Sequence, residues 1–302
     1  MNQEMPINKK SLPTVAVLLA THKPADYIYP QILSIKNQVE VNIQIYWGDF
    51  GSSLEEKERI REYLSGCQVT EINITSSGPA NNFFTLLKES KEEYVSFCDQ
   101  DDIWLPNKTI NQITILQNAH EKPALVHSNS AVLHKEIISN KPVICLDHSF
   151  NSLAFHKCCQ GCTMTLNAAA REVILQNIPN AIVWHDWWAA LVISLTGEIF
   201  FSEDTDTLYR LHDRNAIGIP TKMRKVTRYI CRKRGMVSYQ IQNALNLFGH
   251  MAQLDEKELF QIKRRTSPNR VDRFVGAIKD VKRKPKAHED LIRRILLVIK
   301  QP

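Results

Sequence analysis

The sequence has no apolar run long enough to cross a membrane. Its longest runs, Thr14–Ala20 and Ile295–Ile299, are far shorter than the roughly 20 residues that a spanning helix needs. Residues Met1–Pro13 are polar and lack the apolar centre of a secretory signal. We therefore expect the protein to stay in the cytoplasm.

Paired cysteines are also missing. The seven cysteines are scattered, and an odd number fits no simple disulfide framework. Cys158, Cys159 and Cys162 form the only cluster in the sequence, and no second Cys-x-x-Cys pair accompanies it. A structural zinc site needs about four ordered Cys or His ligands, so we expect reduced cysteines that pack as small apolar groups.

A third absence concerns glycine. The loop Ala20–Pro24, which follows the first apolar run, contains none. A nucleotidyltransferase would place a glycine-rich, basic phosphate loop near its first strand, because backbone NH groups in such loops bind phosphate. Its absence weighs against that class. Nucleotidyl transfer nevertheless stays open as an enzymatic function, because enzymes of that class use clustered carboxylates and a metal, and this sequence contains a carboxylate cluster.

Charge is distributed unevenly along the chain. Residues 1–220 hold 17 Lys and Arg against 25 Asp and Glu, a net charge of −8, whereas residues 221–302 hold 21 against 7, a net charge of +14. Such asymmetry is typical of a body with an appendage of different function. We expect a catalytic domain over residues 1–220 and a basic helical appendage over residues 221–302.

The appendage has three interpretations. Basic clusters occur at Arg224–Arg228, Arg232–Arg234 and Lys282–Lys286, and His288–Lys300 would form a helix with one apolar face and basic flanks. Such a helix could pack on the catalytic domain, or lie on the anionic inner face of the cytoplasmic membrane. A non-enzymatic nucleic-acid module would need a recognition motif, and none is present, so we expect no nucleic-acid partner.

Strand and helix patterns alternate in the first half of the chain, which predicts an α/β fold. Apolar runs typical of buried strands are Thr14–Leu19, Ile43–Trp47, Val69–Ile74 and Tyr94–Cys98. Helical patterns lie between them, at Asp26–Gln38, after the capping box Ser53–Glu56, and at Asn82–Ser90. Repeats of this kind form a sheet of mostly parallel strands flanked by helices. Ligands bind beyond the carboxyl ends of such strands, so the loops after Leu19, Trp47 and Cys98 become candidate site loops.

Three carboxylates follow the last of these strands. Asp99, Asp101 and Asp102 lie within four residues, and their mutual repulsion is costly unless a cation or hydrogen bonds compensate it. Mg²⁺ and Mn²⁺ prefer such oxygen ligands, together with substrate phosphates. An acidic turn that caps the following helix is the alternative, but three acids at one strand end favour a functional site.

The run Asp99-Gln-Asp-Asp-Ile-Trp-Leu-Pro-Asn-Lys108 resembles the aspartate motif of family 2 glycosyltransferases, in particular the bacterial rhamnosyltransferase-like branch that builds cell-surface polysaccharides. Other segments follow in the same order as in that family. They are Ala20-Thr21-His22, Asp49-Phe-Gly-Ser-Ser53, Gly78-Pro-Ala-Asn-Asn82-Phe83, Gly161-Cys-Thr-Met-Thr-Leu-Asn167, His185-Asp186-Trp187-Trp188 and Tyr209-Arg-Leu-His212-Asp-Arg-Asn215-Ala-Ile-Gly218. The resemblance covers about residues 14–218.

This resemblance implies a GT-A fold, a divalent metal, and inverting transfer from a dTDP- or UDP-sugar to a glycan or lipid-linked acceptor. We expect metal binding at Asp101 and His212 and acceptor binding at Trp187 and Trp188; the alternatives are a loop in which His212 and Arg210 are merely solvated and tryptophans that pack in the core. The donor contacts that we expect are Thr21, Asp49, Asn82, Asp99, Asp102 and Arg210. One departure is Phe50, which stands where the family usually has a second acid.

The resemblance also places the general base at Asp186. A carboxylate is suited to deprotonating the acceptor hydroxyl as it attacks the anomeric carbon. Flanking Trp184, Trp187 and Trp188 would desolvate it, which strengthens a carboxylate as a base. Asp186 could also cap the helix that follows, and the two roles are compatible.

Overall fold

The computed structural model describes residues 11–75, 78–140, 147–156, 159–176, 178–180, 182–213, 223–252 and 254–266, with backbone alone for 223–235 and Lys257. The predicted helix at His288–Lys300 and part of the basic clusters lie outside these residues. Among the described helices, none is long and apolar enough to span a bilayer.

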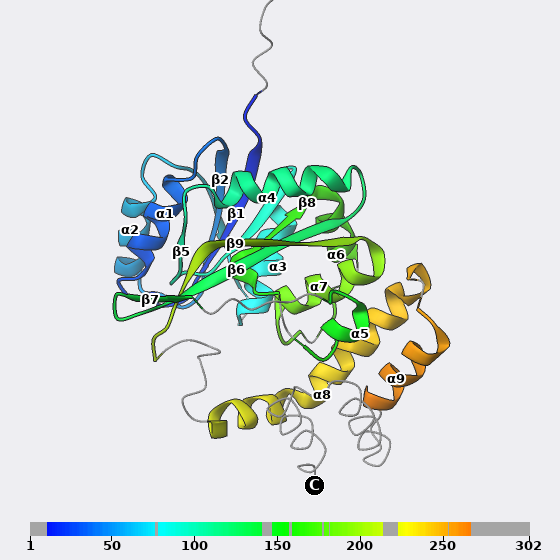
Figure 1. Cartoon of the computed structure of the whole chain (residues 1–302). Helices are drawn as coiled ribbons and strands as arrows, with labels where there is room; N and C mark the ends of the chain where they lie inside the picture. The colour runs from blue at the N-terminus through cyan, green and yellow to red at the C-terminus, as the bar shows by residue number, and fades with distance from the viewer. Residues whose placement is uncertain are drawn as a thin grey trace, which may run out of the picture.

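A single sheet runs through the molecule, and its first half is parallel (Figure 1). The strands there are β1 (Thr14–Thr21), β2 (Asn42–Asp49), β3 (Gln68–Asn73) and β4 (Tyr94–Cys98). Their order is β3-β2-β1-β4, and every neighbouring pair is parallel. The carboxyl ends of β1, β2 and β4 therefore meet at one edge, as the sequence predicted.

The second half of the sheet is mixed. Its strands are β5 (Ile103–Trp104), β6 (Ala124–His134), β7 (Ile137–Asn140), β8 (Met164–Asn167) and β9 (Glu198–Arg210). Strand β8 lies antiparallel between β4 and β6, β9 runs parallel to β6, and β5 and β7 add antiparallel edges. Because β5 directly follows the aspartate cluster and pairs with β9, the loop Asp99–Asp102 is brought to the end of β9.

Helices cover both faces of the sheet (Figure 1). They are α1 (Ile28–Lys36), α2 (Leu54–Tyr63), α3 (Pro79–Glu89), α4 (Lys108–Leu116), α5 (Phe150–Leu153), α6 (Ala168–Gln176), α7 (His185–Thr196), α8 (Met223–Phe248) and α9 (Glu256–Thr266). Val15, Val17 and Leu19 pack against α1, α2 and α4, whereas Ala16 and Leu18 share the other core with α3, α6 and α7. This alternation follows from the two-residue period of a strand.

Residues next to the first turn determine where α2 and α3 begin. The predicted capping box is present, with Ser53 accepting from the backbone NH of Glu56 and the Glu56 carboxylate accepting from the backbone NH of Ser53. Helix α3 begins at Pro79, three residues before the predicted start, because Gly78 turns the chain at a φ of 105° and proline suits the first helical turn.

The second half of α8 belongs to the main core. Ile241, Ala244 and Phe248 are buried in the same cluster as α7. The Gln240 amide accepts from the backbone NH of Val183 at 3.0 Å. At least this part of the predicted appendage therefore packs on the catalytic body.

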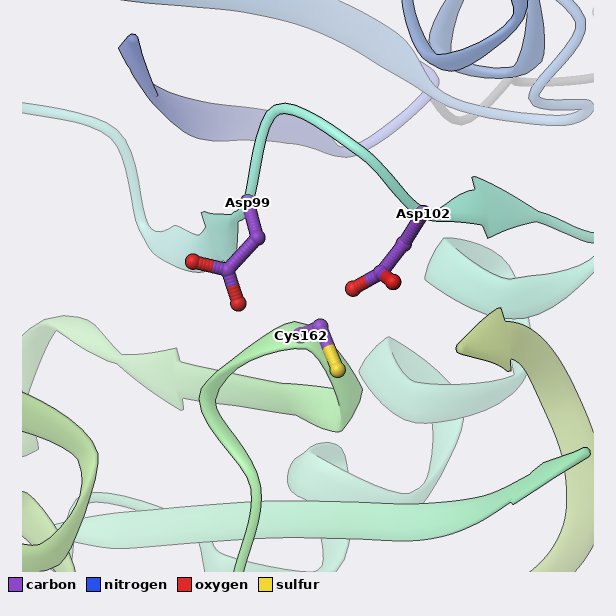
Figure 2. Close-up of side chains that lie close together, drawn as sticks. All are labelled: Asp99, Asp102 and Cys162. Carbon is purple, nitrogen blue, oxygen red and sulfur yellow. The ribbon is translucent and has the colours of Figure 1, made fainter. Parts of the chain in front are cut away.

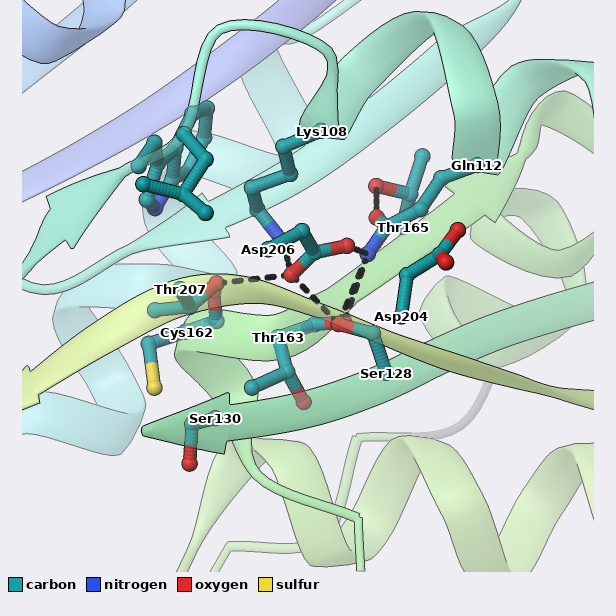
Figure 3. A network of polar contacts seen from close by, with 12 residues as sticks. Lys108, Gln112, Ser128, Ser130, Cys162, Thr163, Thr165, Asp204, Asp206 and Thr207 are labelled. Atoms are coloured by element: carbon teal, nitrogen blue, oxygen red, sulfur yellow. Dashed lines mark hydrogen bonds and ion pairs between the residues drawn. The ribbon is translucent and has the colours of Figure 1, made fainter. Parts of the chain in front are cut away.

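A buried polar network ties α4 to the sheet (Figure 3). Lys108 at the start of α4 has no exposed surface, and its ammonium lies 3.6 Å from the Asp206 carboxylate on β9. One turn later, Gln112 donates to the same carboxylate at 2.8 Å. The Ser128 hydroxyl on β6 donates to it as well. The helix that follows the aspartate loop is thereby fixed to β9.

We predict that Asp206→Asn lowers the free energy of unfolding by about 3–5 kcal/mol, because it leaves the Lys108 ammonium buried without a counter-charge. Urea unfolding measures the change. The double variant Lys108→Met, Asp206→Asn should recover most of the loss, since the buried charge is gone. A double variant as unstable as the single one would contradict this explanation.

Candidate active site

The ends of β1 and β2 are joined by a buried Thr21–Asp49 unit. The Thr21 hydroxyl donates to the Asp49 carboxylate at 2.7 Å and accepts from the indole NH of Trp47 at 3.0 Å. Asp49 also accepts from the hydroxyl and backbone NH of Ser52, and the Lys57 ammonium lies 3.6 Å away. Both Asp49 oxygens are thus engaged within the protein, so this carboxylate holds the strand ends and the turn together.

Phe50 and His22 lie side by side above this unit. The backbone NH of Phe50 donates to the Thr21 carbonyl at 3.0 Å, and the His22 ring contacts the Phe50 carbonyl through Nδ1. The two rings stack with centroids 6.1 Å apart. Where the family usually has a second acid, this chain presents an aromatic pair.

The aspartate loop reaches across to the loop after β1. The Gln100 side-chain oxygen accepts from the backbone NH of His22 at 2.8 Å, and the Gln100 amide donates to the His22 carbonyl at 3.3 Å. Sequence reasoning missed this residue, because a glutamine between two aspartates carries no signal of its own.

Asp101 meets the end of β9. Its carboxylate lies 2.7 Å from Nε2 of His212, and its carbonyl accepts from the Arg210 guanidinium at 2.9 Å. Both side chains of the Asp101–His212 pair keep some exposed surface. The residues predicted to bind metal, Asp101 and His212, are therefore in contact, and Arg210, predicted to bind the donor, joins them.

Asp102 is buried beneath this contact. Its side chain has no exposed surface, and one oxygen accepts from the backbone NH of Arg210 at 3.0 Å. Burial, reinforced by the charge of Asp101, raises the pKa of Asp102 to about 7. The carboxylate of Asp102, which was predicted to contact the donor, is thus buried and anchors the end of β9.

The side chain of Cys162 lies close to two of the carboxylates, those of Asp99 and Asp102 (Figure 2). The ligand atoms of Asp99, Asp102 and Cys162 lie within 4.8 Å of one another. Burial raises the pKa of the Cys162 thiol well above its usual value, and the neighbouring Asp102 and Asp99 charges raise it further. Because Mg²⁺ and Mn²⁺ prefer hard oxygen ligands, this sulfur is a poor ligand for either ion.

The donor atoms at the end of β9 suit a divalent cation better. Asp101 supplies a carboxylate and His212 an imidazole nitrogen 2.7 Å from it, and both remain partly exposed. Oxygen and imidazole ligands of this kind fit Mn²⁺ or Mg²⁺ with substrate phosphates completing the shell. The carboxylate of Asp101 and the imidazole of His212 thus fit the chemistry of the divalent metal that the resemblance implied.

Asp186 opens α7 on the opposite side of the site. Its carboxylate accepts from the backbone NH of Gly161 at 3.0 Å and from the backbone NH of Trp187 at 2.7 Å. A Cβ at Gly161 would stand 2.8 Å from Nε2 of His185, so glycine is required for this close approach. Asp186 is mostly buried, as the hypothesis of a desolvated base requires, and it also contacts the helix start.

The neighbouring tryptophans lie in the core. The Trp188 side chain has no exposed surface, and Trp187 is 4% exposed and donates from its indole NH to the Leu153 carbonyl at 2.7 Å. Both rings, which were predicted to bind the acceptor, therefore pack in the core of the fold. Trp184, which packs edge-on against Trp187, keeps more surface than either.

The remaining predicted donor contacts are Asp99 and Asn82. Asp99 is partly exposed and lies beside Asp102 and Cys162. Asn82 lies in the first turn of α3 and is mostly buried. Helix α3 follows β3, so Asn82 also lies beyond the carboxyl edge of the parallel half of the sheet.

Residues 16–140 match the family model described as Glycosyl transferase family 2. The dTDP-rhamnosyl transferase RfbG of Shigella flexneri is 26% identical over 220 residues, which cover 66% of this chain and 73% of that protein. The UDP-Glc:alpha-D-GlcNAc-diphosphoundecaprenol beta-1,3-glucosyltransferase WfaP of Escherichia coli is 29% identical over 115 residues, or 38% of this chain and 45% of that one.

Solved structures share the fold at low sequence identity. Staphylococcus aureus TarS 1-349 in complex with UDP-GlcNAc has a TM-score of 0.61 and 14% identity, with 94% of this chain and 81% of that chain covered. The mannosyltransferase PcManGT from Pyrobaculum calidifontis, in complex with GDP-Man and Mn²⁺, has a TM-score of 0.54 and 13% identity, with 94% and 84% covered.

The sheet with its flanking helices matches these neighbours, which confirms the predicted fold class. The matched family model and the transferase relatives agree with the motif order in the sequence. Residues 16–140 therefore resemble a family 2 glycosyltransferase domain, and the relatives and the shared fold support a nucleotide-sugar-dependent glycosyltransferase of GT-A fold.

Proposed function

We propose that this enzyme transfers a sugar, with inversion, from a dTDP- or UDP-sugar to a hydroxyl of a glycan or lipid-linked acceptor in cell-surface polysaccharide synthesis. The observation that carries the proposal is the contact between the aspartate loop and the end of β9. There an acid, an imidazole and a guanidinium, from Asp101, His212 and Arg210, gather at one point. Such a set is suited to a sugar diphosphate.

The diphosphate end of the donor is assigned to these residues. Asp101 and His212 would hold Mn²⁺ or Mg²⁺, which when bound neutralises negative charge on the diphosphate. Arg210 supplies a guanidinium for phosphate oxygens. Asp99 and Asn82 are proposed to contact the nucleoside. Thr21 and Asp49 act indirectly, because their side chains bond each other and fix the loops around the nucleoside.

Asp186 is proposed as the general base. The acceptor oxygen forms a bond to the anomeric carbon while the bond from that carbon to the diphosphate oxygen breaks. The diphosphate leaves with the electron pair, and the acceptor proton passes to the Asp186 carboxylate. One in-line displacement of this kind inverts the anomeric carbon and needs no covalent intermediate. The backbone NH groups of Gly161 and Trp187 orient the carboxylate.

The sugar is proposed to be rhamnose carried on dTDP. Support comes from the name of the Shigella flexneri relative, a dTDP-rhamnosyl transferase, over 66% of this chain. The Escherichia coli relative is named as using UDP-Glc, so a UDP-sugar is the second candidate.

Residues 1–220 are proposed as the catalytic domain and residues 221–302 as a basic extension that contacts the inner face of the cytoplasmic membrane. The described part supplies apolar and basic groups side by side. Phe260 on α9 is 59% exposed, and Lys263 in the last turn of the helix is exposed as well. An exposed aromatic ring and an exposed ammonium together suit an anionic lipid surface.

We predict that Asp101→Asn greatly weakens Mn²⁺-dependent binding of dTDP or UDP without lowering the unfolding temperature, because the partly exposed carboxylate is lost from the metal site while the fold is retained. Titration calorimetry in Mn²⁺ and in EDTA measures the effect. Binding that is unchanged in Mn²⁺ would remove Asp101 from the metal site.

We further predict that Asp186→Asn lowers kcat by roughly 10²–10⁴-fold, the usual contribution of a positioned base, while the donor Kd stays near that of the wild type. Asparagine keeps one oxygen that can accept from the Gly161 NH, but its NH2 group cannot accept from the Trp187 NH, so thermal unfolding of the variant is recorded beside its kcat. Asp204→Asn is the matched control, because Asp204 is exposed and bonded only to Ser202 nearby. A normal kcat for Asp186→Asn would exclude Asp186 as the base.

A further inference from the structure

Tyr27 stands against the two cationic or metal-binding groups at the end of β9. Its ring stacks on the His212 ring, with centroids 4.9 Å apart and planes at 17°. The Arg210 guanidinium carbon lies 4.8 Å from the centre of the same ring. No motif in the sequence pointed to Tyr27, which precedes α1 by one residue.

The support behind Tyr27 is rigid. Its carbonyl accepts from the backbone NH of Gln31 at 3.3 Å, so Tyr27 is held by the first turn of α1. That helix is anchored in the core by Ile28, Ile32 and Ile35, all of them almost fully buried. A ring on such a base keeps its position when its neighbours move.

The support behind His212 is weaker. The last backbone bond that joins the end of β9 to β6 runs from the Leu211 NH to the Leu133 carbonyl at 2.8 Å. His212 follows this bond, so the sheet no longer fixes its orientation. Its imidazole is oriented by side-chain contacts, which include the Asp101 carboxylate on one nitrogen and the Tyr27 ring on its face.

We propose that Tyr27 is a positioning residue of the donor site, whose flat ring holds His212 and Arg210 toward Asp101. The proposal rests on the function proposed above, since it assigns metal and diphosphate to these groups. Stacking at 17° limits rotation of the imidazole, and the electron-rich ring face attracts the guanidinium. Outer groups that orient a metal-binding histidine typically contribute 10–100-fold to metal affinity.

The chain offers matched variants for the test. Tyr27→Phe keeps the ring and removes the hydroxyl, whereas Tyr27→Leu keeps apolar volume and removes the flat face. Tyr29→Leu is the control, because Tyr29 belongs to the same helix, is half exposed, and packs on Tyr63. Each variant is titrated with UDP by calorimetry in Mn²⁺ and in EDTA, and its thermal unfolding is recorded.

We expect Tyr27→Leu to weaken Mn²⁺-dependent UDP binding by roughly 10–100-fold while leaving weak binding in EDTA and the unfolding temperature unchanged. Tyr27→Phe and Tyr29→Leu should bind like the wild type. Wild-type affinity in Tyr27→Leu would overturn the proposal. So would an equal loss with and without Mn²⁺, or a joint loss of affinity and thermal stability, since either result indicates general packing. A loss in Tyr27→Phe as large as in Tyr27→Leu would also overturn it, because the hydroxyl would then be responsible.

Asp101→Asn in the same assay separates the two proposals. If Asp101→Asn abolishes Mn²⁺-dependent UDP binding and Tyr27→Leu does not alter it, the positioning role fails and the metal site stands. If Asp101→Asn has no effect, the metal assignment fails, and the role of Tyr27 fails with it.

Discussion

The hydrogen bond from the backbone NH of Arg210 to the buried carboxylate of Asp102 fixes the geometry on which the site depends. It joins the loop after β4 to the end of β9, two segments more than 100 residues apart in the chain. Burial makes ionisation of Asp102 costly, and for this reason its pKa is raised to about 7. A carboxyl group held in this way sets where Asp101, Arg210 and His212 lie.

Other contacts reinforce the same junction from several sides. The Lys108–Asp206 ion pair joins α4 to β9. Gln100 accepts a hydrogen bond from the loop after β1, and the Tyr27 ring packs on His212 and Arg210. Each of these contacts joins elements that are distant in sequence. The site therefore depends on the assembled sheet, in which β5 pairs with β9 and brings the aspartate loop to the end of β9.

Much of this arrangement could be predicted from the sequence. Apolar runs marked the four parallel strands, and parallel strands share a carboxyl edge, so Thr21, Asp49 and the aspartate loop had to meet. The capping box joins Ser53 and Glu56, which are three residues apart, so it could be predicted from the local sequence, and the structure confirms it. The mixed half of the sheet was not predictable in the same way, because β8 and β9 pair with strands far away in the chain.

Burial of single side chains was the weakest point of sequence reasoning. Trp187 and Trp188 have flat faces suited to sugars, but α7 turns them into the core, which a local pattern cannot reveal. No sequence pattern indicated that Lys108 is buried, because its partner Asp206 lies 98 residues away in the chain. Asp102 differs from Asp101 only in the direction in which the loop aims it.

The central claim is that pyrimidine nucleoside diphosphates and their sugars bind where the aspartate loop contacts the end of β9, and that a divalent cation is required for this binding. Thermal unfolding of the wild-type protein with dTDP, UDP, dTDP-rhamnose and UDP-glucose, each in Mn²⁺ and in EDTA, tests it most directly. The account predicts that at least one ligand raises the unfolding temperature with the logarithm of its concentration, and that EDTA removes the effect. No shift with any of the four, or an equal shift in EDTA, would contradict it.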